Sequence, residues 1–111
     1  MKVIYIAGKY TGKCENDVYT NIQTARIEAE FVWAMGGMAF CPHMNSAFMG
    51  GITDNQNFYE GDIEMLKRCD AIYLITCWQD SWGASREKEL AEKLGMTILK
   101  NRIDVMDYLK E

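Results

Sequence analysis

Short apolar runs alternate with longer segments of helical periodicity, and this alternation constrains the fold more than any other feature of the sequence. Four runs are apolar and nearly continuous, as is typical of strands buried on both faces of a sheet: Val3–Ala7, Met38–Cys41, Ala71–Cys77 and Met96–Leu99. Segments with apolar residues at helical spacing follow them, namely about Val18 to Met35, Asn55–Arg68, Gly83–Leu94 and about Ile103–Leu109. This repeated strand–helix order predicts a parallel sheet with helices on both faces.

The predicted fold is therefore α/β, of the flavodoxin-like or Rossmann-like kind: a three-layer α-β-α sandwich with a parallel sheet of four to five strands. We expect one domain over residues 1–111, because no linker, repeat or low-complexity tract interrupts the chain. In open sheets of this kind the ligand binds beyond the carboxyl ends of the strands. The segments expected at that edge are Gly8–Lys13, Pro42–Gly51 and Trp78–Ser85.

Charge and hydropathy exclude several classes of partner. The 12 Lys and Arg residues against 16 Asp and Glu give a net charge of -4, which disfavours binding to a nucleic-acid polymer. No apolar run approaches the roughly 20 residues that span a bilayer, so no membrane partner is expected. The chain runs directly from Met1-Lys2 into the first apolar run without a signal peptide, and we therefore expect a cytoplasmic protein.

The four cysteines are expected to be reduced thiols. No two of them form a C-x-x-C pair, and the chain has one histidine. A closed zinc site would therefore need nearly every cysteine at unsuitable spacings. We expect no metal site and no disulfide framework, because the apolar core is sufficient without either.

Glu87 is the first candidate for chemistry. It lies one turn before Leu90 and Ala91, on the predicted inward face of the helix Gly83–Leu94. A carboxylate turned toward a core needs partners, and the positive end of a helix dipole can keep it ionised, which suits a nucleophile. The alternative is a glutamate near the helix start with its head in water.

Asp62 is the second candidate, and its orientation is ambiguous. It shares helical spacing with Phe58 and Met65, but a competing apolar stripe through Ile63 would place it near an edge. An inward Asp62 together with Glu87 would form the pair of carboxylates that retaining glycosyl transfer requires, in which one attacks and the other handles the proton.

Tyr5 occupies the middle of the first strand. A buried phenol usually finds a hydrogen-bond partner, and Glu87 is a plausible one if the hydroxyl reaches the ligand site. The alternative is a tyrosine at the rim of the sheet.

Three loops at the same edge carry candidate binding residues. The loop Gly8–Lys13 offers backbone amides and side-chain donors to an anion, although it also reads as an ordinary turn between strand and helix. Ser81 opens the third long helix, where it can cap the helix or hold a phosphate. His43 could contact a base or sugar, or lie in solvent. The candidate binding residues are Gly8, Lys9, Tyr10, Gly12, His43, Ser81, Gly83 and Ser85.

Three segments together resemble the nucleoside 2-deoxyribosyltransferase-like superfamily. IYIAG (Ile4–Gly8) has the family's tyrosine three residues before the glycine. EGDIEMLKRCDAIYLI (Glu60–Ile75) places the family's catalytic aspartate on Asp62, and SWGASRE (Ser81–Glu87) places its nucleophilic glutamate on Glu87. The chain is most similar to a small bacterial and phage branch, and it also resembles the deoxynucleoside 5'-monophosphate N-glycosidases.

The resemblance implies a mechanism that needs no cofactor. Glu87 would attack C1' of a 2'-deoxyribosyl group, Asp62 would manage protonation of the leaving base, and Tyr5 would orient Glu87. The covalent intermediate would pass to water in a hydrolase or to another base in a transferase. Members of the superfamily are oligomeric, so a homodimer or larger homo-oligomer is implied, with a small-molecule nucleoside or nucleotide as its ligand.

Ser81 bears on the substrate that the resemblance implies. The transferases tend to have aspartate at this position and the monophosphate glycosidases serine, so Ser81 favours a 5'-monophosphate, with Lys9 or Lys13 as counter-charge. The chain departs from the pattern at Ser85, where the family has a second glycine, and in the loop that holds Lys9. The alternative function is a non-catalytic nucleotide-binding domain of the same fold.

Overall fold

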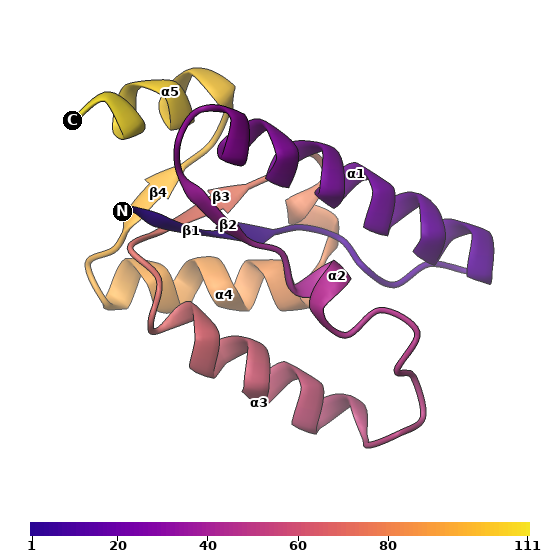
Figure 1. Ribbon diagram of the computed structural model, residues 1–111. Helices are drawn as coiled ribbons and strands as arrows, with labels where there is room; N and C mark the ends of the chain where they lie inside the picture. The colour runs from indigo at the N-terminus through magenta and orange to yellow at the C-terminus, as the bar shows by residue number, and fades with distance from the viewer.

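The computed structural model describes residues 1–111 and places a four-stranded parallel sheet between two layers of helices (Figure 1). The strands are β1 Val3–Ala7, β2 Met38–Phe40, β3 Ala71–Leu74 and β4 Thr97–Leu99. They pair in the order β2-β1-β3-β4, and all three pairings are parallel. This is the flavodoxin-like order without a fifth strand, so the predicted α/β fold is confirmed.

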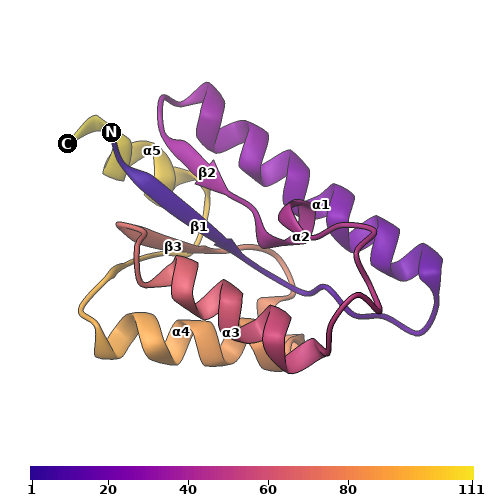
Figure 2. The same ribbon diagram turned by 60° about the horizontal axis from the view of Figure 1, so that its bottom comes forward.

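The helices divide between the two faces of the sheet. Helices α1 (Glu15–Ala34) and α5 (Arg102–Lys110) cover one face, and α3 (Asn55–Leu66) and α4 (Trp82–Lys93) cover the other (Figures 1 and 2). A single turn, α2 (Pro42–Asn45), follows β2. None of these helices is long and apolar enough to cross a bilayer.

Of the boundaries that differ from the sequence-based predictions, three have identifiable reasons. Helix α1 begins at Glu15 rather than near Val18, because acidic residues in its first turn complement the helix dipole. The segment after β2 forms the turn α2 instead of an open loop, with Pro42 pre-set at its start. Strand β3 ends at Leu74, and Cys77, which was predicted to be in it, has a left-handed backbone with φ 64° at the start of the 3₁₀ turn Trp78–Asp80.

Alternation along β1 assigns side chains to the two layers. Ile4 and Ile6 are buried in the cluster that includes the apolar residues of α1 and α5. Tyr5 is buried in the other cluster, together with Ala84 and Ala91 of α4. The phenol of Tyr5 therefore lies on the α4 side of the sheet, as a one-residue alternation requires.

Gly8 follows β1 at the edge where the candidate site lies. A Cβ atom at this position would lie 2.4 Å from Cγ1 of Ile75, the residue that follows the end of β3. A glycine is therefore required for the close approach of the two chain segments.

A half-buried carboxylate joins three elements on the opposite face of the sheet. Glu28 of α1 accepts a hydrogen bond from the hydroxyl of Tyr73 at 2.5 Å. It also accepts two from Arg102 of α5, at 3.0 Å from Nε and 2.8 Å from Nη2. The hydrogen bonds from Arg102 hold the pKa of Glu28 below its ordinary value.

Replacing Glu28 by alanine is expected to lower the free energy of unfolding by about 2 kcal/mol, because the Tyr73 hydroxyl loses its partner and the bidentate pair is lost. The depressed pKa means that this stabilisation is present above the unfolded-state pKa of the carboxyl and is lost as pH falls through the folded-state pKa. Urea denaturation at neutral pH measures the effect. Glu30→Ala removes an exposed carboxylate from the same helix, and equal losses in the two variants would contradict the prediction.

Candidate active site

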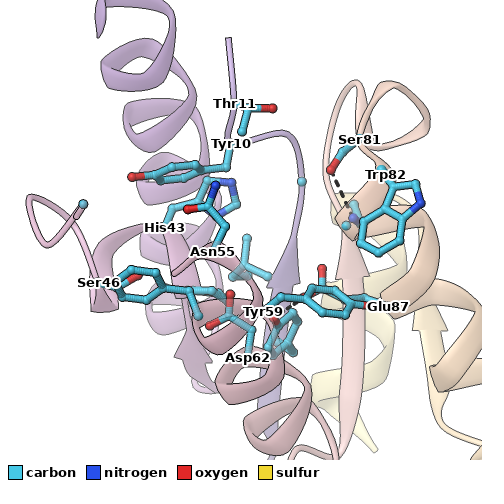
Figure 3. A pocket seen from close by; sticks show the side chains of 18 residues that line it. Tyr10, Thr11, His43, Ser46, Asn55, Tyr59, Asp62, Ser81, Trp82 and Glu87 are labelled. Atoms are coloured by element: carbon cyan, nitrogen blue, oxygen red, sulfur yellow. Dashed lines mark hydrogen bonds between the residues drawn. The ribbon is translucent and has the colours of Figure 1, made fainter. Parts of the chain in front are cut away.

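A cavity of about 350 Å³ opens beyond the carboxyl end of β1, between α2, α3 and the start of α4 (Figure 3). Its size is in the range of small-molecule sites. Its wall contains two carboxyl groups, those of Asp62 and Glu87, and neither a lysine nor an arginine. The cavity therefore combines buried acidic groups with an otherwise uncharged lining.

Glu87 is turned into the protein rather than into water. Only 7% of the residue is exposed, and its carboxylate accepts a hydrogen bond from the hydroxyl of Tyr5. Burial raises the pKa of Glu87 to about 8; the hydrogen bond from Tyr5 lowers it, and the charge of Asp62 raises it. Burial and the charge of Glu87 also raise the pKa of Tyr5, so that its phenol remains a donor. The solvent-exposed alternative for Glu87 is excluded.

Asp62 reaches the same cavity from the facing helix. It is half-buried on α3, while Glu87 comes from α4, and Figure 3 shows both at the inner end of the cavity. Burial raises the pKa of Asp62 to about 6. The two predicted apolar stripes of α3 are both partly covered, which leaves Asp62 at the edge that faces the cavity.

The start of α4 forms one side wall. The hydroxyl oxygen of Ser81 accepts a hydrogen bond from the backbone N–H of Ala84 at 3.1 Å, which caps the helix. Trp82 is 64% exposed, and its ring centroid lies 5.3 Å from that of Tyr59 at an interplanar angle of 48°. This wall therefore offers the positive end of the helix dipole and an aromatic pair.

Tyr10 and His43 form the opposite wall (Figure 3). His43 lies in the turn α2 and is 5% exposed, with its Nε2 2.9 Å from the carbonyl oxygen of Lys9. The ring centroids of Tyr10 and His43 are 5.7 Å apart. Burial holds the pKa of His43 below its ordinary value, so the imidazole is neutral.

Most of the residues predicted from the sequence meet in this cavity. The predicted catalytic residues Tyr5, Asp62 and Glu87 all line it. So do five of the predicted binding residues, namely Gly8, Tyr10, His43, Ser81 and Gly83. Their functional roles remain predictions, but the structure brings them to one place.

Lys9, Gly12 and Ser85 do not line the cavity. Lys9 and Gly12, together with Lys13, line a separate polar depression at the start of α1. The loop is held toward α1 because the side-chain amide of Asn21 donates to the carbonyl of Tyr10 at 3.0 Å. Neither lysine is therefore placed to act as a counter-charge inside the cavity.

Several lining residues were not predicted as site residues. Asn55 and Tyr59 lie seven and three residues before Asp62 on α3, so helical spacing would have assigned them to the same face. Ser46 and Gly50 come from the loop after α2. The segment Pro42–Gly51 was predicted to lie at this edge, but its sequence has no periodicity that could have identified these two residues.

The fold and the paired carboxylates define an α/β domain with a candidate active site at the carboxyl edge of its sheet. Residues 2–100 match the protein family described as Domain of unknown function (DUF4406), and the chain belongs to that family. This family is one of the nucleoside 2-deoxyribosyltransferase-like superfamily, which confirms the resemblance. None of the curated proteins matches the sequence.

Among solved structures, the fold is similar to that of a 2-deoxyribosyltransferase from the psychrotolerant bacterium Bacillus psychrosaccharolyticus, which is described as a biocatalyst for the synthesis of antiviral and antitumoral nucleosides. The two structures superpose with a TM-score of 0.63 over 86% of this chain and 69% of that chain, at 18% sequence identity. At this identity the likeness shows a shared fold.

Proposed function

We propose that this protein breaks the N-glycosidic bond of 2'-deoxynucleosides or their 5'-monophosphates and passes the deoxyribosyl group to water or to another base. The observation that carries the proposal is the buried Glu87 carboxylate, which Tyr5 holds in the same cavity as Asp62. Two carboxyl groups that face one cavity are what retaining glycosyl transfer requires.

In the first proposed step, an oxygen of Glu87 forms a bond with C1' of the sugar. The bond between C1' and the base nitrogen breaks, and its electron pair leaves with the base. Asp62 donates a proton to the leaving base, as a carboxyl with a raised pKa can do near neutral pH. Tyr5 fixes the orientation of the Glu87 carboxylate through its hydrogen bond.

In the second step, water or an incoming base attacks C1' of the glycosyl ester. The bond between C1' and the Glu87 oxygen breaks, and the electron pair returns to the carboxylate. Asp62 removes a proton from the attacking group, which restores the starting state. No further reactant is needed for the balance of atoms and charges.

The charges around the cavity favour the uncharged nucleoside over the 5'-monophosphate. Lys9 and Lys13 lie outside the cavity wall, so only Ser81 and the start of α4 would face a phosphate. The charge of the Asp62 carboxylate would repel it. We therefore expect nucleosides to react faster than their monophosphates.

Chromatographic detection of free base tests the proposal. The protein is incubated with each of the four 2'-deoxynucleosides and with the matching 5'-monophosphates. If no base is released, a second free base is added to detect exchange. Release or exchange supports the proposal. If neither release nor exchange is detected but nucleoside still raises the Tm of the protein, the proposal is replaced by the non-catalytic nucleotide-binding function.

The pH dependence of base release is expected to be bell-shaped, with limbs near pH 6 and pH 8. The carboxyl pair must hold one proton, because Glu87 attacks as a carboxylate while Asp62 donates a proton. The raised pKa values of about 6 for Asp62 and about 8 for Glu87 bound the range in which the pair is singly protonated. Within this range the proton lies mainly on Glu87, and the reactive form is the minority form in which Asp62 holds it. Measuring kcat/KM from pH 5 to pH 9 tests this; a flat profile would contradict it.

Asp62→Asn is expected to reduce kcat/KM about 100-fold or more and to change the shape of the profile. With one carboxyl left, the rate should rise with pH through the pKa of Glu87 and then stay level, because no proton-donating group remains to be titrated. Asp70→Asn is the matched control, since Asp70 precedes β3 and is exposed outside the cavity. An alkaline limb that persists in Asp62→Asn would exclude Asp62 as the proton donor.

A further inference from the structure

The face of α3 that carries Asp62 also carries an amide side chain that the proposed reaction does not use. Asn55 lines the same cavity, and Figure 3 shows its amide group pointing from α3 into it. The residue is exposed, and no hydrogen bond joins its side chain to another residue of the cavity wall. Its donor and its acceptor therefore both remain available to a ligand.

The chemistry of a side-chain amide suits the edge of a nucleobase. Two other polar side chains of the cavity are paired within the chain, since the Tyr5 hydroxyl donates to Glu87 and the Ser81 oxygen accepts from Ala84. Asn55 differs from them because its amide holds a free donor and a free acceptor side by side in one plane. The edges of nucleobases present donors and acceptors in the same arrangement, and asparagine is a recurrent partner of such edges.

The spacing of Asn55 and Asp62 fits one base. The two residues are seven apart, so they lie on the same face of α3 with a rise of about 10.5 Å between them. Two hydrogen bonds of about 2.9 Å each, one from each residue, would leave roughly 5 Å between the groups that they bind. A separation of this order spans a purine or pyrimidine together with its exocyclic groups.

The exposure of the cavity residues gives the direction in which the base extends. Glu87, which must face C1', is buried, Asp62 is half-buried, and Asn55 is exposed. Asp62 must also face the leaving base in order to protonate it. A base that is attached to C1' at Glu87 and faces Asp62 therefore extends outward along α3, and its far edge reaches Asn55.

We propose that the side-chain amide of Asn55 forms hydrogen bonds with the edge of the bound base that lies opposite the glycosidic bond. The proposal rests on the function proposed above. It makes Asn55 a specificity-determining residue, because a base whose far edge lacks the matching donor or acceptor loses one of the two hydrogen bonds.

Asn55→Ala is expected to raise KM about 10-fold and to change kcat less than about threefold, because the contact is present both before and during bond cleavage. The substitution removes an exposed side chain without a partner, so the Tm should stay the same. Asn57→Ala is the matched control. Asn57 is exposed on the same helix, its amide donates to Thr53 at 3.2 Å, and it does not line the cavity, so KM should not change.

Substrate analogues show whether Asn55 contacts the base. Purine 2'-deoxyriboside lacks only the amino group of 2'-deoxyadenosine, and the 2'-deoxyriboside of 2-pyrimidinone lacks only that of 2'-deoxycytidine. For guanine or thymine, methylation of the ring N–H removes the donor. With whichever base the protein releases, we expect loss of the donor to lower kcat/KM about 10-fold in the natural protein and to have little further effect in Asn55→Ala.

Binding to Glu87→Gln is measured without turnover. Adding Asn55→Ala to this variant should weaken the calorimetric Kd for nucleoside about 10-fold. The NMR signals of the Asn55 side-chain amide, identified by their absence after Asn55→Ala, should move when nucleoside binds, whereas those of Asn57 should stay in place.

The outcomes separate this proposal from the proposed function. An unchanged KM in Asn55→Ala, or equal losses with the analogue in the natural protein and in Asn55→Ala, would overturn the role of Asn55 while base release still stands. Amide signals of Asn55 that stay in place while calorimetry shows nucleoside bound would do the same. No binding and no base release with any nucleoside would overturn both.

Discussion

Glu87→Gln is expected to lower the rate of base release at least about 1,000-fold while leaving the protein folded. Glutamine has the same shape as glutamate, and its amide oxygen can still accept the hydrogen bond from Tyr5. It cannot form the ester with C1', because the amide is a poor nucleophile. Rates measured by chromatography of the free base, at saturating nucleoside, give the loss in kcat.

Glu92→Gln is the matched control for this loss. Glu92 lies on the same helix, is exposed, and pairs with Lys88 on the surface. The control removes the same charge from α4 without touching the cavity, and it should retain the full rate. If Glu87→Gln kept more than about a tenth of the activity, Glu87 could not be the nucleophile.

The same substitution is expected to stabilise the fold at alkaline pH by roughly 5 kcal/mol. Burial raises the pKa of Glu87 from an ordinary 4.5 to about 8, so the folded state binds a proton there more tightly than the unfolded state. The free energy of unfolding should therefore fall as pH rises between about 4.5 and 8. A glutamine cannot ionise, and this loss should be absent from Glu87→Gln.

Thermal denaturation of both proteins from pH 5 to pH 9 measures the difference. The variant and the natural protein should have similar Tm values near pH 5 and diverge as the pH rises. The exposed Glu92→Gln should follow the natural protein throughout. Parallel curves for Glu87→Gln and the natural protein would mean that burial does not raise the pKa of Glu87 in the folded state.

The order of strands and helices could be predicted because each buried strand is a short apolar run and each long helix has a periodic apolar face. The inward orientation of Glu87 followed from the same periodicity, since Leu90 and Ala91 lie on its face of α4. Asn55 and Tyr59 lie at helical spacing from Asp62, so the same periodicity would have placed them on the face of α3 that carries Asp62. Local periodicity was therefore sufficient wherever one helix face decided the placement.

The remaining features depend on contacts between distant segments. The position of the loop that contains Lys9 is set by Asn21, whose amide binds the carbonyl of Tyr10 from helix α1. The burial of His43 depends on the turn α2 and on the Lys9 carbonyl, neither of which has a local sequence signal. Two overlapping apolar stripes left the orientation of Asp62 undetermined until α3 was placed against α4.

The covalent intermediate is the central claim, and the intact mass of the protein tests it most directly. The protein is mixed with its nucleoside substrate, quenched in acid during turnover, and measured before and after proteolysis. We predict a species heavier by one 2'-deoxyribosyl group, with the added mass on the peptide that contains Glu87 and absent from Glu87→Gln. Base release at full rate with an unmodified protein at every time point, or an added mass on another residue, would contradict the mechanism.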